Sequence, residues 1–291
     1  MRTRLVFAMA AFAAVLAVAG WGMFSPSRAA RPAPPAGPPI AFPSPTPGPA
    51  MAPLPDLRKW HLVYNPKFLG THLDTTKWNT CYPWVPDPAA GCTNFGNAKE
   101  KEWYLPGQDR VSSKTLSLVA QHKRTTGTGR AGHKKIYHCR SGMVTSDKSF
   151  TFKYGYVRIK ARVTENPGLW SALWLGAASF KWPPEIDLIE AYGPPSVKAA
   201  VNFHPGGQKG SRVGLPAAQA KGLTTGWHTF SVLWTYHKLV WYVDGHSVMV
   251  VRRSIPHQAM YLIANVADYS LLPAGSCDGR MLVRSVQVWK R

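Results

Sequence analysis

Acidic residues are scarce in this chain of 291 residues, which holds 14 Asp and Glu against 35 Lys and Arg and carries a formal net charge of +21. Three of these few acids nevertheless fall within six residues, as Glu185, Asp187 and Glu190. Chance is a weak explanation for such a cluster in an acid-poor chain. The segment 183–193 is therefore the strongest functional signal in the sequence.

Other absences narrow the class of protein. No long helical periodicity competes with the short alternating segments, such as 156–163 and 282–289, that Gly, Pro and Asn clusters separate. No Cys-x-x-Cys pair or spaced His cluster favours a metal site, and no base-reading motif accompanies the positive charge. The sequence predicts an all-β antiparallel sandwich that binds no cofactor and no nucleic acid.

The N-terminus has the pattern of an export signal. Basic residues in 1–4 lead into the apolar run 5–24, and Ser27-Arg28-Ala29 offers small residues for cleavage. No Cys directly follows the run, which argues against a bacterial lipoprotein anchor. Residues 1–29 are predicted to be a signal peptide of a secreted, extracellular protein. The run is also long enough to stay uncleaved and tether the protein to a membrane.

Two further segments follow the export signal. Residues 30–55 are rich in Pro and Ala and predict an extended linker without a core of its own. The remaining segment, 56–291, has a length that suits one large β domain. We expect this domain to be a monomer.

Four cysteines in an exported chain predict two disulfides. Cys81 and Cys92 bracket a short Pro-containing loop, which favours their local pairing. That pairing would leave Cys139 to bond with Cys277, near the C-terminal strand.

The spacing of the three acids predicts an irregular strand. In a regular strand Glu185 and Asp187 share a face and Glu190 points the other way. One extra residue around 188–189 would form a bulge and return Glu190 to the first face. Paired carboxyl groups on one wall suit glycoside hydrolysis, and a third acid between them raises the cost of ionising all three. The alternatives are a solvated strand face or a cation site.

With this cluster and its surroundings, the chain resembles glycoside hydrolase family 16, the retaining β-glycanases of jelly-roll fold with the signature E-x-D-x-x-E. Ser171 stands where the family usually has Pro. The resemblance extends over nearly everything from about residue 57 to the C-terminus. The other segments that resemble the family are 68–78, 102–104, 141–144, 152–158, 168–175, 227–230 and 241–245.

The resemblance implies a jelly roll whose concave sheet carries the substrate cleft. It implies that Glu185 is the nucleophile, Asp187 the assisting carboxyl group and Glu190 the acid/base. The residues that it indicates for sugar binding are Trp170, Trp174, Trp103, Tyr104 and His204. Many family members bind a structural calcium ion, but Pro66, Lys67 and Arg284 occupy the corresponding neighbourhoods here, so we expect no metal.

These features together predict an exported, retaining endo-β-glycosidase acting on a β-1,3- or mixed β-1,3/1,4-glucan. An alternative is an exopolysaccharide depolymerase or transglycosylase acting on an acidic polymer, and a more distant one is a non-catalytic sugar-binding domain. The basic segment 121–135 predicts an exposed loop. Its charge would either attract anionic cell-envelope polymers or simply keep the protein soluble.

Overall fold

The computed structural model describes residues 52–84, 100–128, 134–166, 168–192, 198–206, 210–269 and 277–291. Contacts divide the chain into two units, Met1–Thr46 and Pro47–Arg291, and every described residue belongs to the second. The predicted signal peptide and most of the predicted linker lie outside the described residues, so both stay predictions. Among the described residues, no helix has the length and apolar character that crossing a membrane requires.

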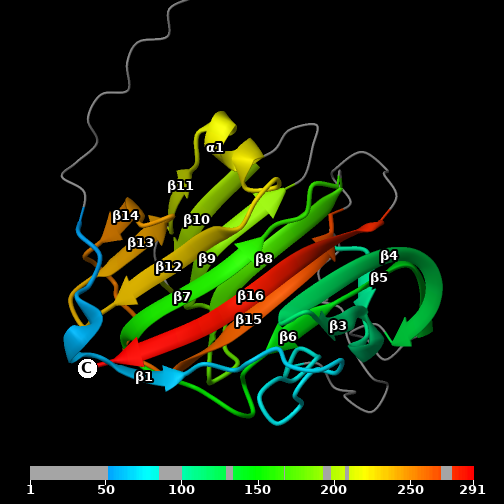
Figure 1. Ribbon diagram of the computed structural model, residues 1–291, viewed down its shortest axis with the longest axis horizontal. Coiled ribbons are helices and arrows are strands. Elements are labelled where there is room, and N and C mark those ends of the chain that lie inside the picture. The colour runs from blue at the N-terminus through cyan, green and yellow to red at the C-terminus, as the bar shows by residue number, and fades with distance from the viewer. Residues whose placement is uncertain are drawn as a thin grey trace, which may run out of the picture. The chain divides into compact units, whose positions relative to one another are not determined.

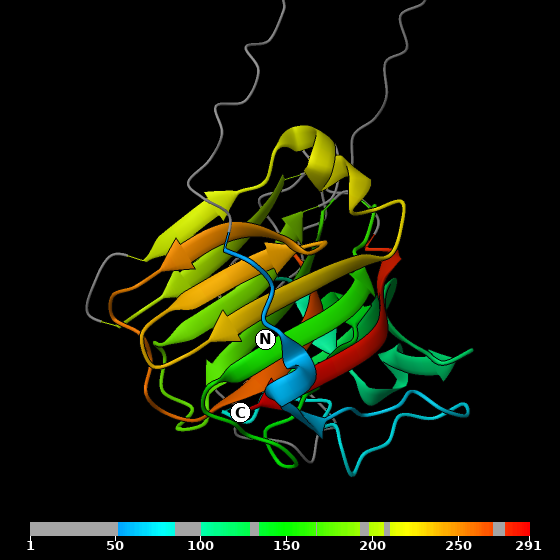
Figure 2. The same cartoon turned by 60° about the vertical axis from the view of Figure 1, so that its left-hand side comes forward.

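The described strands form two facing sheets (Figures 1 and 2). The larger sheet has the order β14 (His246–Val251), β13 (Leu239–Val243), β12 (His228–Trp234), β7 (Gly155–Arg162), β16 (Gly279–Lys290), β4 (Thr115–Thr128), β5 (Lys134–Ser141) and β2 (Glu102–Tyr104). In addition, β1 (His61–Tyr64) pairs with β16 and β3 (Asp109–Ser112) pairs with β4. The smaller sheet has the order β11 (Ser211–Gly214), β10 (Lys198–His204), β9 (Glu185–Tyr192), β8 (Leu169–Ala177), β15 (Met260–Asp268) and β6 (Met143–Thr145).

Neighbouring strands are antiparallel except for β2 and β5. Helical segments in the described residues are short: η1 (Leu57–Lys59), η3 (Pro106–Gln108) and α1 (Ala217–Gly222). Figure 1 shows α1 at the end of the smaller sheet where β10 and β11 lie. The predicted all-β sandwich is confirmed.

The core fills the space between the two sheets. From the larger sheet, β7 turns Val157 and Ile159 inward, and from the smaller sheet β9 turns Ile186 and Leu188 inward. Burying each such side chain contributes about 1.5–3 kcal/mol. Because this burial fixes one face of β9 against the larger sheet, it also fixes the positions of the polar side chains on the opposite face of the strand.

The end of the predicted linker lies against this domain. Pro53 accepts a hydrogen bond of 2.9 Å from the hydroxyl of Tyr242 through its backbone carbonyl. Ala52 packs beside the aromatic cluster that includes Tyr242. The described contacts of the domain therefore include residues that precede Asp56.

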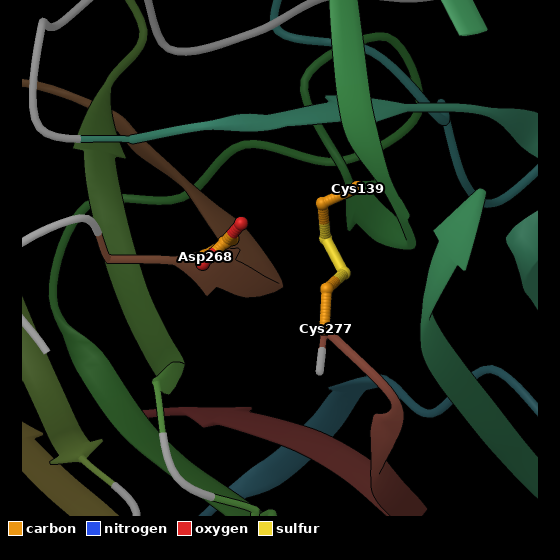
Figure 3. Close-up of side chains that lie close together, drawn as sticks. All are labelled: Cys139, Asp268 and Cys277. Carbon is orange, nitrogen blue, oxygen red and sulfur yellow. A yellow bond between two sulfur atoms is a disulfide. The ribbon is translucent and has the colours of Figure 1, made fainter. Parts of the chain in front are cut away.

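A disulfide joins Cys139 on β5 to Cys277, which precedes β16, with 5.7 Å between the Cα atoms. Figure 3 shows Asp268 close to this bond. The pairing of Cys139 with Cys277 is confirmed. Cys81 is buried, and its expected partner Cys92 lies outside the described residues, so that second pairing stays a prediction.

Replacing Cys139 with Ser should lower the free energy of unfolding by about 4 kcal/mol, because the bond closes a loop of 138 residues in the unfolded chain. For a domain of this size the thermal midpoint should fall by about 10 °C, measured by calorimetry without reductant. Adding Cys277→Ser to the same variant should cost little more. A midpoint equal to that of the wild type would contradict a stabilising role for the bond.

Candidate active site

A bulge in β9 brings the three predicted carboxyl groups to one face. Leu188 has no partner of its own on β8, because its neighbours Asp187 and Ile189 pair with consecutive residues of that strand. The register against β10 shifts at the same place. The extra residue turns Glu190 to the side of Glu185 and Asp187, as bulges do when they re-aim a side chain. The predicted bulge is confirmed.

His204, on β10, lies against the first two acids. Its Nε2 atom is 3.5 Å from Oε1 of Glu185 and 3.6 Å from Oδ2 of Asp187. Trp182, in the segment that precedes β9, lies beside His204 with 5.8 Å between the ring centroids and lines the same pocket as Glu185. Residues of β10 and of the segment before β9 therefore surround Glu185.

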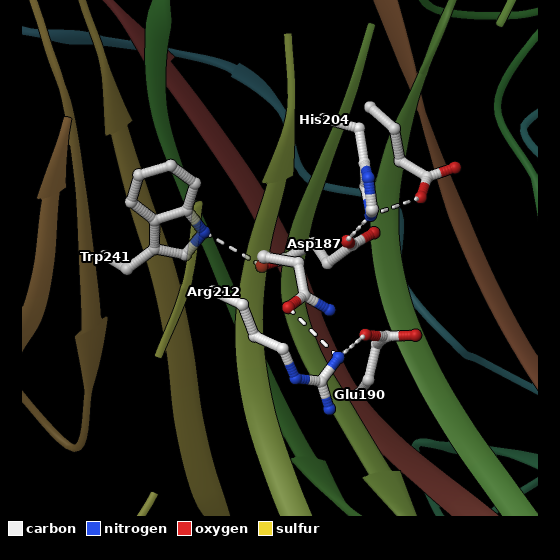
Figure 4. A network of polar contacts seen from close by, with 7 residues as sticks. Asp187, Glu190, His204, Arg212 and Trp241 are labelled. Carbon is white, nitrogen blue, oxygen red and sulfur yellow. Dashed lines mark hydrogen bonds and ion pairs between the residues drawn. The ribbon is translucent and has the colours of Figure 1, made fainter. Parts of the chain in front are cut away.

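Arg212, on the edge strand β11, reaches across β10 to the third acid. Its Nη1 atom is 3.1 Å from Oε2 of Glu190 and donates a second hydrogen bond, of 3.2 Å, to Oδ1 of Asn202. Figure 4 shows Arg212 and Glu190 facing each other beside Asp187 and His204. The Glu190 side chain is 12% exposed and that of Arg212 is 53% exposed, so the cation sits at the mouth of the site.

Burial and mutual repulsion set the charge of the cluster. Burial, followed by the charge of Glu190, raises the pKa of Glu185 to about 8, although hydrogen bonds from Trp182 and Asp187 favour its ionised form. Burial and the two neighbouring carboxylates raise the pKa of Asp187 well above its usual range. Burial also raises the pKa of Glu190, and Arg212 opposes that rise. The three groups therefore resist ionising together, and the cluster keeps a proton at neutral pH.

His204 responds in the opposite direction. Burial, with a smaller contribution from the charge of Arg212, lowers the pKa of the imidazole. His204 is therefore neutral at neutral pH, and its ring can both donate and accept a hydrogen bond beside Glu185 and Asp187.

A buried tryptophan supports the bulge from below. Trp241, on β13 of the larger sheet, donates a 2.8 Å hydrogen bond from Nε1 to the backbone carbonyl of Asp187. Figure 4 shows this indole pointing toward β9. The bulge interrupts the regular hydrogen bonding between strands at this carbonyl. The bond from Trp241 therefore satisfies a buried acceptor and fixes the position of the Asp187 backbone relative to the larger sheet.

An aromatic groove opens beside Glu185. It has a volume of about 570 Å³, and its lining includes Trp84, Trp174, Phe180, Trp182, Glu185 and Tyr261. The side chains of Phe180 and Trp182 are among the large exposed apolar groups of the described residues. Flat exposed rings next to carboxyl groups suit a sugar, whose C–H faces stack on aromatic surfaces while its hydroxyls meet polar groups.

The predicted sugar-binding residues divide between this groove and the interior. Trp174 lines the groove, with its Nε1 fixed by Asn265 at 2.9 Å. Trp170 is half-buried and stacks on Tyr192, with 5.0 Å between ring centroids. His204 contacts the acids, as described above.

Trp103 and Tyr104 lie elsewhere. Trp103 is 2% exposed and packs against Tyr137 of β5, so it joins β2 to the β4–β5 hairpin. Tyr104 is fully buried, and its hydroxyl accepts a hydrogen bond from Asn265. Neither side chain presents a surface to the groove; both belong to the packing that supports it.

Several residues of the site were not expected from the sequence. Trp182 and Phe180 precede β9 without any regular pattern, and Arg212 is one cation among many in a basic chain.

A second pair of acids was also not expected from the sequence. Glu100 and Glu102 are buried, and burial together with the charge of Glu102 raises the pKa of Glu100 to about 10. Their spacing of two residues in an acid-poor chain is a signal that could have identified this second pair.

A two-sheet antiparallel sandwich with clustered carboxyl groups beside an aromatic groove defines the architecture of a polysaccharide-cleaving glycoside hydrolase. The model of the Glycosyl hydrolases family 16 matches residues 99–276. The chain belongs to this family.

Similar proteins agree with this assignment. The chain is 31% identical over 201 residues to the endo-1,3-1,4-beta-glycanase EglC of Rhizobium meliloti (strain 1021) and 29% identical over 199 residues to ExsH, of the same description and organism. Each match covers 65% of this chain and 42% of the relative, so the chain spans less than half the length of these relatives. The laminarinase catalytic domain from Thermotoga maritima MSB8 superposes with a TM-score of 0.64 at 26% identity, covering 80% of this chain and 98% of that one.

Proposed function

We propose that this protein is a retaining endo-β-glycanase that cleaves β-1,3- or mixed β-1,3/1,4-glucan. The observation that supports it most is the bulge at Leu188, which gathers Glu185, Asp187 and Glu190 on one face beside the aromatic groove. Relatives described as endo-1,3-1,4-beta-glycanases favour the glucan as substrate.

In the first step of the proposed reaction, Glu185 attacks the anomeric carbon while Glu190 gives its proton to the departing glycosidic oxygen. The C–O bond breaks and a glycosyl ester forms on Glu185. In the second step Glu190 takes a proton from water, the water oxygen attacks the anomeric carbon, and the ester breaks. Two displacements at the same carbon retain its configuration.

Asp187 and His204 assist without reacting. Burial raises the pKa of Asp187 well above its usual range, so this carboxyl group keeps a proton that it can donate to Glu185, which stabilises the charged form that attacks. Neutral His204, in contact with both acids, orients them without adding a positive charge. The groove beside Glu185 would hold the sugar units on one side of the bond that breaks.

The test is the release of reducing ends from laminarin, lichenan, agar and an acidic exopolysaccharide, with product length followed by chromatography. We expect oligosaccharides of several lengths from laminarin or lichenan early in the reaction, as internal cleavage produces. Glu165→Ala, which removes an exposed carboxylate that lines a different pocket, is the matched control and should keep full activity. Binding to these glycans without cleavage would contradict the proposal and favour a sugar-binding domain.

A second candidate function is cleavage or transglycosylation of an acidic exopolysaccharide. The observation that favours it is the long β4–β5 hairpin, which projects from the edge of the sandwich (Figures 1 and 2). Neither strand holds an acid, and the exposed cations that are described on the two strands are Lys123, Arg124, Lys134 and Lys135. Activity confined to the acidic polymer in the same panel, and lost as salt rises, would establish this function in place of the first.

The proposed function also implies a cell compartment. We infer export, because the N-terminal apolar run has the pattern of a signal peptide and a polymeric glucan is an extracellular substrate. The disulfide between Cys139 and Cys277 suits an oxidising compartment. Mass spectrometry of the N-terminus of protein collected from culture medium would distinguish a cleaved signal from an uncleaved anchor.

A further inference from the structure

We propose that Arg212 is a positioning residue for Glu190: it holds this carboxyl group at the mouth of the site and stabilises it whenever it has lost its proton. The inference rests on the proposed function, since it gives Arg212 a part in both displacements.

The geometry places this cation where Glu190 needs it. Arg212 lies on the edge strand β11, opposite Asn202 of β10, and its guanidinium reaches Glu190 on the next strand. The second hydrogen bond, from the same Nη1 atom to Asn202, anchors the guanidinium to β10. A side chain held at two points has less freedom to leave Glu190 for solvent.

Several charged or titratable groups surround Glu190, and Arg212 is the one among those described that carries a positive charge. The groups that contact Glu190 or act on it electrostatically, directly or through its neighbours, are Glu185, Asp187 and Tyr192 of β9, His204 of β10, Arg212 of β11 and Glu100 before β2. The acids all disfavour a charged Glu190, and His204 is neutral. Arg212 is therefore the one permanent cation that the described residues place against this carboxyl group.

This charge matters at two stages of the reaction. In the first displacement Glu190 must give up a proton, and a neighbouring cation makes it a stronger acid. In the glycosyl-enzyme Glu190 must stay ionised in order to accept a proton from water. Without Arg212, burial would make Glu190 a weaker acid in the first displacement and would leave it more protonated in the glycosyl-enzyme.

The test is the pair of variants Arg212→Met and Arg212→Lys, with Arg110→Met on β3 as the control that removes an exposed cation from the other sheet. In Arg212→Met, the alkaline limb of kcat/KM on glucan should move up by about 1 pH unit, because the acid releases its proton less readily. At neutral pH the kcat/KM on glucan should fall about 10-fold. Arg212→Lys, which keeps the charge, should recover most of the shift.

A substrate with an activated leaving group separates the two stages. A dinitrophenyl β-glycoside needs no proton to leave, so its kcat reports the second displacement. In Arg212→Met, the acidic limb of that kcat should also move up, because Glu190 becomes protonated in the glycosyl-enzyme at a higher pH. Unchanged limbs with a lowered thermal midpoint would show that Arg212 is merely structural and would overturn the proposal.

A measurement without substrate keeps this inference distinct from the proposed function. Carbon-13 NMR of Glu carboxyl groups, with Glu190 assigned through Glu190→Gln, follows the titration of Glu190 in the free protein. Its midpoint should rise by about 1 unit in Arg212→Met and stay unchanged in Arg110→Met. If the midpoint rises but no glucan is cleaved, the proposed function fails and the pairing stands; if it does not rise, the inference about Arg212 fails by itself.

Discussion

Replacing Glu185 with Ala should reduce hydrolysis of the glucan by about 10⁴-fold or more, because the group that forms the glycosyl ester is gone. The fold should stay intact. The side chain lies on the cleft face of β9, and its removal relieves repulsion with Glu190 and Asp187. The measurement is initial rate of reducing-end release, with circular dichroism as the check on folding.

Azide makes this prediction specific to a nucleophile. In Glu185→Ala, azide can enter the space left by the carboxyl group and attack an activated β-glycoside from the same side. The product should be an α-glycosyl azide, of inverted configuration, and NMR identifies it directly. A β-glycosyl azide from this variant would refute the assignment of Glu185. The inverted anomer appearing first in the wild-type reaction would refute retention as a whole.

Replacing Glu190 with Ala should reduce kcat/KM on the glucan by about 10²–10⁴-fold, because a sugar leaving group needs a proton. A dinitrophenyl β-glycoside should still form the glycosyl ester on Glu185 at a rate near that of the wild type. Its breakdown should be slow, since no base activates water, so a burst of dinitrophenol should precede a slow steady state.

Azide again distinguishes the roles. In Glu190→Ala it should attack the glycosyl ester, speed the steady state and give the β-glycosyl azide, of retained configuration. The two variants thus predict opposite anomers from the same nucleophile and substrate. Equal losses on glucan and on the activated glycoside would contradict an acid role for Glu190.

Much of this fold could be predicted from the sequence, because the alternation that marks a strand depends only on residues close together in the chain. Alternation of apolar residues in segments such as 156–163 correctly predicted strands, since a half-buried strand must repeat every two residues. The odd spacing of Glu190 correctly predicted the bulge by the same rule. The pairing of Cys139 with Cys277 followed from the assumed pairing of the other two cysteines, and the structure confirms it.

The site beyond its acids was harder to predict because its other members depend on long-range placement. Arg212 reaches Glu190 only because β11 pairs with β10 and β10 pairs with β9 in the same sheet. The spacing of residues within one segment does not predict this strand order. Trp103 and Tyr104 were predicted to bind sugar, but both side chains are buried. Aromatic residues suit both a sugar groove and a core, and only tertiary packing decides between these places.

The bulge at Leu188 has a consequence for how the length of this strand can vary. Without Leu188, the segment would contain acids at every second position and would place all three on one face of a regular strand. The extra residue is thus accommodated by the bulge, and Nε1 of Trp241 donates a hydrogen bond to the backbone carbonyl of Asp187 beside it. A strand one residue shorter here would present the same three carboxyl groups without a bulge, so two different spacings of the acids lead to the same arrangement on one face.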